Sequence, residues 1–308
     1  MTLPNFFIVG ASKSGTTSLY HYLKQHPEIY MCPDKEPQFY RYANGLPEIG
    51  SRNAIMSAEH WQWLNSRKFP NSEEYQMLFE GVTKEKAIGE ASTPYLISNE
   101  APVNISQAVP HAKIIIILRN PFDAAYSEFC MDRRENKYQN KASFLEVLQA
   151  EDLEDMSLEH FPRLIRTRFY DAHIERYLEY FPRNQISFHL MEDLSVTDHL
   201  FLEIFKFLEV SPDFKIDDTY RHNAGHAQKI NLFHLNILKL PDFMKKGIKM
   251  LLPNFIRQLY WNKLLAVDTK KLPVKCPEVE KEFLRPIFTP RIQRLQDLID
   301  RDLSMWLE

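Results

Sequence analysis

The sequence contains few cysteines, and their positions do not suggest a shared site. Among 308 residues there are only three, Cys32, Cys130 and Cys276, which lie far apart and form no CxxC pair. This scarcity argues against a disulfide framework and against a zinc knuckle, and it suits a reducing compartment. We therefore expect a cytoplasmic protein without a metal site.

Long hydrophobic runs and an excess of positive charge are also missing. No apolar stretch approaches the roughly 20 residues needed to cross a bilayer, and no charged leader followed by an apolar run indicates a signal peptide. The formal net charge is −3. Binding of nucleic acid or glycosaminoglycan would therefore require a local basic patch, and we expect no nucleic-acid partner.

The composition is that of an ordinary globular enzyme domain. Hydrophobic residues make up 44% of the chain and charged residues 26%, which provides enough apolar surface for a substantial core. No linker-like stretch, internal repeat or low-complexity tract divides the sequence. We therefore expect a single domain over residues 1–308.

Strand and helix patterns alternate along the chain. Short apolar runs predict strands within 5–10, 28–42, 86–90, 110–121 and 184–194, of which "IIIIL" in 110–121 is the strongest. Helical patterns cover 16–27, parts of 51–80, the segment after Pro121, 143–150, 163–180, 197–209 and a final helix over 288–307 with Pro290 near its start. This alternation predicts an α/β fold, with a P-loop-type central parallel sheet flanked by helices.

A glycine-rich turn joins the first strand to the first helix. Gly10 and Gly15 have the spacing of a phosphate-binding loop, in which backbone N–H groups and a helix N-terminus bind an anion. An ATPase loop needs lysine directly after the second glycine, but Thr16 stands there, and the lysine is Lys13, inside the loop. A glycine turn without a ligand is the weaker alternative.

A second candidate anion site follows the strongest strand. Arg119 lies where an ATPase would place its magnesium-binding aspartate, and Ser127 lies about two turns into the next helix. Ligands of open α/β sheets bind at the carboxyl ends of strands, so Arg119 and Ser127 could form a phosphate site there. Alone, Arg119 could equally form a surface ion pair.

Several blocks together resemble the sulfotransferases that use 3′-phosphoadenosine 5′-phosphosulfate (PAPS), in particular a bacterial branch related to heparan sulfate sulfotransferases. The resemblance covers nearly the whole chain and is weakest from about 225 to 280. The blocks, in the order of the family, are "IVGASKSGTTSLYHYL", "KEPQFY", "GEASTPYL", "ILRNPFDAAYSEF", "RYLEYFPRNQISFHLMEDL" and "RIQRLQDLIDRDLSMWL".

The resemblance implies the sulfotransferase fold, PAPS as sulfuryl donor, and no required metal. A donor with a 5′-phosphosulfate and a 3′-phosphate needs two separate anion sites, which would explain the displaced lysine. By correspondence, the 5′-phosphosulfate would be held by Lys13, Ser14, Gly15, Thr16 and Thr17, and the 3′-phosphate by Arg119 and Ser127. Further candidates for cofactor binding are Ser18, Tyr170, Arg221 and Asn223.

The resemblance also implies the catalytic groups. Glu36 in "DKEPQFY" matches the glutamate proposed as general base in heparan-type relatives, and Lys35 beside it could contact the acceptor or the sulfuryl group. We expect Lys13 to protonate or stabilise the departing phosphate oxygen. From the residues alone, "DKEP" is better explained as a solvated charged turn.

Two features leave the acceptor open. Relatives carry lysine soon after the glutamate of the "GE" block, where this chain has Ala91 and Ser92, so a glycosaminoglycan acceptor is in doubt and Glu90 could be structural or touch the acceptor. Residues 239–275 are basic and apolar; they could be a lid over the acceptor, a surface that contacts a membrane peripherally, or plain amphipathic helices. A hydroxyl of a sugar, lipid or small alcohol is the expected acceptor.

Two other functions compete with sulfuryl transfer. A P-loop kinase or nucleotidase is disfavoured by Thr16 in the lysine position and by Arg119 at the strand end. A non-catalytic module that binds PAPS or its product 3′-phosphoadenosine 5′-phosphate (PAP) would not need a base at Glu36. The sequence does not indicate an oligomeric state.

Overall fold

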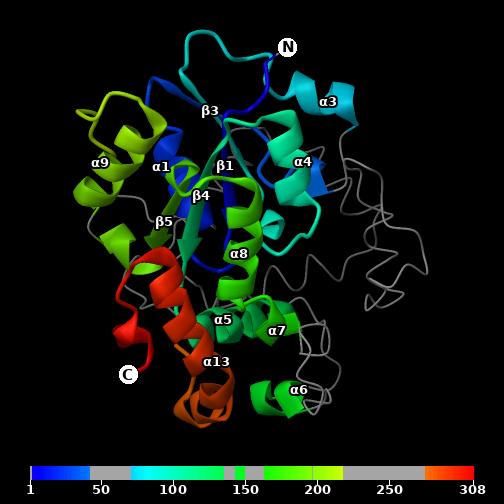
Figure 1. The fold of residues 1–308 in the computed structure, drawn as a ribbon, viewed down its shortest axis with the longest axis vertical. Helices are drawn as coiled ribbons and strands as arrows, with labels where there is room; N and C mark the ends of the chain where they lie inside the picture. The colour runs from blue at the N-terminus through cyan, green and yellow to red at the C-terminus, as the bar shows by residue number, and fades with distance from the viewer. Residues whose placement is uncertain (1, 42–70, 135–142, 150–162, 196, 218–274) are drawn as a thin grey trace, which may run out of the picture. The chain divides into compact units, whose positions relative to one another are not determined.

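The computed structural model describes residues 2–41, 71–134, 143–149, 163–195, 197–217 and 275–308 (Figure 1). Residues 1–219 and 275–308 belong to one compact unit. Residues 220–274 are assigned to a second unit, which lies outside the described residues. A single domain over 1–308 therefore stays a prediction.

The first unit is built on a five-stranded sheet with the order β2-β3-β1-β4-β5. All neighbouring strands are parallel, and Ile8 in the central strand is paired with Ala91 on one side and Ile115 on the other. The strands are β1 (Phe6–Gly10), β2 (Ile29–Met31), β3 (Ala87–Ala91), β4 (Lys113–Leu118) and β5 (Ile186–Leu190). The predicted P-loop-type parallel sheet flanked by helices is confirmed.

Helices follow the strands and cover the sheet (Figure 1). The helices are α1 (Thr16–Leu23), α3 (Ser72–Met77), α4 (Ala101–Ala108), α5 (Pro121–Arg134), α6 (Phe144–Gln149), α7 (Arg163–Arg166), α8 (Tyr170–Tyr180), α9 (Thr197–Leu208) and α13 (Glu278–Ile299). Short 3₁₀ turns are η1 (Phe39–Arg41), η2 (Thr93–Tyr95), η4 (Arg183–Gln185), η5 (Met191–Ser195) and η6 (Ser304–Trp306). None of the helices within the described ranges is both long and apolar enough to cross a bilayer.

Side chains of the sheet alternate between two hydrophobic cores. Phe6 and Ile8 pack with residues of α1 and α9, whereas Phe7 and Val9 pack with residues of α4, α8 and α13. Successive side chains of a strand point to opposite faces, and a parallel sheet covered on both faces is apolar throughout. The fully buried runs "FFIVG" and "IIIIL" reflect this arrangement.

The last helix begins earlier than predicted. The sequence placed its start near Pro290, but α13 begins at Glu278 and contains both Pro286 and Pro290. Proline removes a backbone hydrogen bond inside a helix. The helix nevertheless continues because a helically spaced apolar stripe is buried along it: Leu284, Phe288, Ile292, Leu295 and Ile299.

The strand order reverses beside the central strand. After β1 the chain adds β2 and β3 on one side, and then β4 and β5 on the other. The carboxyl ends of β1 and β4 therefore flank the point at which the strand order reverses, where open α/β sheets bind ligands. The loop after Gly10 and the residue Arg119 both lie at this point.

Candidate active site

The loop between β1 and α1 depends on glycine. Gly15 precedes the first helical residue with φ 88°, a left-handed torsion that glycine adopts without strain. A Cβ at Gly15 would lie 2.5 Å from Leu194 Cδ1, and one at Gly10 would lie 2.6 Å from Leu96 Cβ. Gly15 is therefore required by its left-handed torsion, and Gly10 by its close packing against Leu96.

Lys13 occupies a strained position inside this loop. Its φ is 67°, which is unfavourable for a residue with a Cβ. The ammonium nitrogen Nζ lies 3.6 Å from the sulfur of Met131 on α5. The loop therefore directs the lysine side chain toward α5, the helix that also carries Ser127.

Arg119 contacts the same loop from the end of β4. Its Nη1 donates a hydrogen bond to the carbonyl oxygen of Lys13 at 3.2 Å. The side chain is buried, which lowers the pKa of Arg119, while Asp123, Tyr170 and Glu192 oppose that shift. An arginine remains charged under these conditions, so a buried cation adjoins the loop at the switch point.

Among the described residues, two buried hydroxyl groups in this region have no hydrogen-bond partner apart from one another. They are Ser14 Oγ in the loop and the Tyr170 hydroxyl at the start of α8. Burial raises the pKa of Tyr170, and the nearby Arg168, Ser14 and Arg119 oppose the rise, which brings Tyr170 into the same neighbourhood as the loop. Buried polar groups normally have partners, and both hydroxyls are suitable donors to phosphate oxygens.

Three of the other predicted cofactor-binding residues lie on the first turn of α1. Thr16 and Ser18 are buried and Thr17 is half-buried. Ser127 is buried on α5. The loop residues and Arg119 thus lie at the carboxyl ends of β1 and β4, and Ser127 lies on the helix that follows β4. Their role in binding stays a prediction.

A buried ion-pair network lies next to Ser127, and the sequence analysis missed it. Glu128 accepts from Arg163 and Arg168, and Arg163 also contacts Asp132. Burial opposes ionisation, yet Arg168 and Arg163 lower the pKa of Glu128 to about 2. Glu128 and Asp132 lie one helical turn apart on α5, so this acidic pair on one face of a largely buried helix was the available signal.

Glu36 is held at the same edge of the sheet by the end of β3. Its backbone N–H donates to Ala91 O at 2.9 Å. Its carboxylate accepts from the backbone N–H and the hydroxyl of Thr93, both at 3.0 Å. Lys35 Nζ lies 2.7 Å from Glu36 Oε1. The carboxylate is thus fixed but remains partly exposed, at 22% of its side chain.

The strand pairing relates Glu36 to the loop. The N–H of Ser92, which follows β3, donates to Ile8 O of β1 at 3.1 Å, and Leu96 N–H donates to Val9 O at 2.8 Å. The segment that holds Glu36 therefore leaves the sheet beside the strand that ends in the loop. A solvated charged turn, the simpler interpretation of "DKEP", does not describe this anchored carboxylate.

Glu90 is completely buried. It accepts hydrogen bonds from Tyr75 and, at 2.6 Å, from Ser92 Oγ. Of the two roles considered from the sequence, the buried position supports a structural role over contact with the acceptor.

Some predictions fall outside the described residues. Arg221 and Asn223 do, as does the basic stretch 239–275 except for Lys275. In the part of the chain that is described, no three His, Cys, Asp or Glu side chains gather as a metal site would require.

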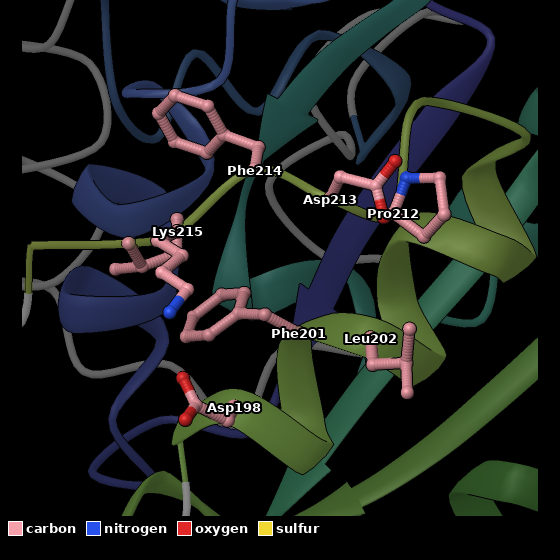
Figure 2. A pocket seen from close by; sticks show the side chains of 8 residues that line it. Asp198, Phe201, Leu202, Pro212, Asp213, Phe214 and Lys215 are labelled. Atoms are coloured by element: carbon pink, nitrogen blue, oxygen red, sulfur yellow. The ribbon is translucent and has the colours of Figure 1, made fainter.

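A separate hollow lies on the α9 side of the sheet (Figure 2). It has a volume of about 260 Å³ and lies between α9, with Phe201 and Leu202, and the segment from Pro212 to Ile216. None of the predicted site residues that the structure describes lines it, so we assign it no part in the candidate active site.

The sheet, the loop at its switch point and the adjoining buried arginine define an α/β protein of the phosphate-loop type. The family model described as Sulfotransferase domain matches residues 3–248. The chain belongs to this sulfotransferase family, which confirms both the resemblance and the expectation of an enzyme.

Individual relatives agree with this assignment. The chain is 31% identical over 219 residues to the human bifunctional heparan sulfate N-deacetylase/N-sulfotransferase 3, covering 70% of this chain and 23% of that protein. The Drosophila melanogaster bifunctional heparan sulfate N-deacetylase/N-sulfotransferase is 28% identical over 234 residues, covering 72% and 21%. The chain thus spans about a quarter of the length of these curated relatives. A solved sulfotransferase from Alicyclobacillus acidocaldarius is similar over 100% of both chains, with 30% identity and a TM-score of 0.68.

Proposed function

We propose that this protein transfers a sulfuryl group from PAPS to a hydroxyl group of an acceptor. When bound, PAPS would supply the sulfuryl group and two separated anionic ends. The observation that carries the proposal is the pair of buried hydroxyls of Ser14 and Tyr170 at the loop that adjoins the buried Arg119; among the described residues they have no hydrogen-bond partner apart from one another. These donors fit a ligand rich in phosphate oxygens.

The residues of the loop would bind and orient the 5′ end of the donor. The backbone N–H groups of the loop, together with the hydroxyls of Ser14, Thr16, Thr17 and Ser18, offer neutral donors at a helix N-terminus. Lys13 would hold a positive charge beside the phosphate oxygen and stabilise negative charge as it develops there. Arg119, Ser127 and Tyr170 would bind the 3′-phosphate side.

Glu36 would accept the proton of the acceptor hydroxyl. General-base catalysis of this kind contributes about 10²–10⁴-fold. The carboxylate has the required accessibility, and Thr93 and Lys35 orient it. Lys35 would also contact the acceptor. Replacing Glu36 with glutamine should therefore abolish most transfer while donor binding persists.

The acceptor atom has two candidates. Names of the curated relatives include N-sulfotransferase activity, so a primary amine is a second candidate acceptor. Removal of a proton by Glu36 would serve either nucleophile. A screen with matched hydroxyl-bearing and amine-bearing sugars would distinguish the two.

Ligand-induced thermal stabilisation tests the donor site directly. PAP, AMP and ATP–magnesium would be compared on the wild type and on Arg119→Ala. A ligand at 100 times its Kd adds about 2.7 kcal/mol of stability. We expect stabilisation by PAP that is absent with AMP and lost in the variant. A response to ATP–magnesium with none to PAP would overturn the proposal in favour of a kinase-like enzyme.

A further inference from the structure

A buried hydrogen-bond network lies behind Glu36. Its centre is Glu90 on β3, whose side chain is inaccessible to solvent and accepts from the Tyr75 hydroxyl and from Ser92 Oγ at 2.6 Å. The carboxylate therefore cannot touch an acceptor. Glu90 instead contacts Ser92, which is hydrogen-bonded to the segment that carries Glu36.

The Ser92 hydroxyl transmits the contact to that loop. Its oxygen accepts the backbone N–H of Gln38 at 3.1 Å. A hydroxyl has one proton, so donation to Glu90 turns its lone pairs toward Gln38. An ionised Glu90 thus fixes the orientation of Ser92 and completes the chain Gln38 N–H, Ser92 O–H, Glu90.

The segment after β2 needs this support because its backbone is strained. Glu36 has φ 66° and Gln38 has φ 56°, both in the left-handed region. Such torsions cost free energy in residues other than glycine and persist only when the surroundings impose them. Thr93 and Ala91 hold Glu36 itself, and Ser92 holds Gln38. The Tyr95 hydroxyl accepts Tyr40 N–H at 3.0 Å and fixes the far end.

We propose that Glu90 is a positioning residue for sulfuryl transfer: its ionised carboxylate orients Ser92, and Ser92 holds the strained segment that presents the Glu36 carboxylate. The inference rests on the proposed function of Glu36. Glu90 takes no part in the chemical step itself.

The surroundings of Glu90 make this role sensitive to pH. Burial raises the pKa of Glu90 to about 7; the hydroxyls of Ser92, Tyr75 and Tyr95 oppose the rise, and the charge of Glu36 adds to it. The titratable groups that face Glu90 from the packed elements are Cys32, Glu36, Tyr40, Tyr75, Tyr95 and Tyr177. None of these is a cation, so the carboxylate depends on neutral donors.

The direction of the pH dependence distinguishes a positioning role of Glu90 from a simple contribution to stability. The folded-state pKa of about 7 lies above the ordinary value of 4.5. Ionisation of Glu90 therefore disfavours folding, and its contribution to stability is best below pH 4.5 and declines as the pH rises to about 7. A positioning role requires the opposite trend in kcat, which should rise through the same pH range.

The test compares Glu90→Gln and Ser92→Ala with the wild type, and uses the exposed Glu73→Gln as a matched control. Glutamine offers one acceptor where the carboxylate offers two, so one hydroxyl loses its partner. We expect kcat to fall about 10- to 100-fold in both variants, as small misplacements of a catalytic group do. The rise of kcat near pH 7 should disappear in Glu90→Gln, while stabilisation by PAP and the melting temperature at pH 8 are retained.

Hydrogen exchange of the protein without ligands provides an independent readout. We expect faster exchange at the Gln38 amide in both variants and no change in Glu73→Gln. The proposal would be overturned if both variants kept the kcat and the Gln38 exchange rate of the wild type. It would also be overturned if the variants were partly unfolded at pH 8 and the unfolded fraction accounted for the whole loss of kcat. If Glu90→Gln does not fold, Ser92→Ala decides alone. If the wild type transfers no sulfuryl group, the proposed function fails, and the exchange data still decide the link from Glu90 to Gln38.

Discussion

At the scale of single residues, the carboxyl edge of the sheet stands out for its backbone strain. Lys13, Glu36 and Gln38 all have positive φ, at 67°, 66° and 56°. A left-handed torsion costs an L-residue roughly 1–2 kcal/mol. Such strain is common at functional sites, where the surrounding fold imposes it. Here the strain affects Lys13 and Glu36, which are proposed to act in catalysis, and Gln38, which lies two positions after Glu36.

Replacing Lys13 with alanine should separate catalysis from binding. If the ammonium stabilises charge that develops during transfer, kcat should fall about 10²–10³-fold, whereas the Kd for PAP should rise much less. Steady-state kinetics and calorimetric titration with PAP measure the two effects. Lys24→Ala, at the exposed end of α1, is the control and should change neither. Equal losses in kcat and affinity would indicate simple charge binding.

At the scale of elements, the junction between α5 and the helices α7 and α8 depends on buried charge. Glu128 receives both Arg163 and Arg168, and the side chain of Arg168 is only 1% exposed. Removing one partner from a buried ion pair leaves the other uncompensated. The network therefore fixes the position of α5, which carries Ser127 and Met131.

The Glu128→Gln variant should lose about 3–5 kcal/mol of stability at pH 7. The folded-state pKa of about 2 lies below the ordinary 4.5, so the stabilisation is complete above pH 4.5 and is lost as the pH falls toward 2. Denaturant unfolding at several pH values should show the two proteins converging in acid. The exposed Glu203→Gln should stay within about 0.5 kcal/mol of wild type. A pH-independent difference would contradict the ion-pair explanation.

The elements also show what sequence patterns can and cannot predict. The buried runs of β1 and β4 predicted parallel strands correctly, because a sheet covered on both faces requires continuous apolar sequence. The start of α13 was missed because Pro290 suggested a boundary, while burial of the stripe containing Phe288 and Ile292 outweighed the local cost of Pro286 and Pro290.

For the site, the loop could be predicted from local chemistry because glycine spacing determines its backbone. The anchoring of Glu36 could not be predicted in this way, since its partners Thr93 and Ala91 are distant in sequence, and its proposed role as base was predicted only through the family resemblance. The pairing of Arg168 with Glu128 was likewise unpredictable, because the two residues are 40 positions apart in the sequence. Pairings of this kind arise from tertiary contacts that no local pattern encodes.

At the scale of the whole described unit, stability comes from two cores separated by one sheet. Ile204 of α9 belongs to the core that contains Phe6, and Ile292 of α13 belongs to the core that contains Phe7. Each residue is buried, at 0% and 2% exposure. They share no packing cluster, so their contributions to stability should be independent.

Ile204→Val and Ile292→Val should each cost about 0.5–1.5 kcal/mol. The double variant should lose the sum within about 0.5 kcal/mol, since separated sites are additive. Denaturant unfolding monitored by two probes measures these values and tests whether the cores unfold together. A matched pair within one core, Ile292→Val with Leu295→Ala, should deviate from additivity. Strong coupling between Ile204 and Ile292 would show that the sheet transmits strain between its faces.

The central place of β1 has a consequence for the order of assembly on the ribosome. β1 is synthesised before the other strands of this sheet, yet both of its partners, β3 and β4, come from much later in the chain. Its apolar segment "FFIVG" therefore has no strand to pair with while the intervening residues are synthesised. Pairings between distant segments form slowly. The same connectivity that brings the phosphate loop next to Arg119 thus leaves an apolar strand unpaired until β4 has been made, and unpaired apolar strands favour aggregation.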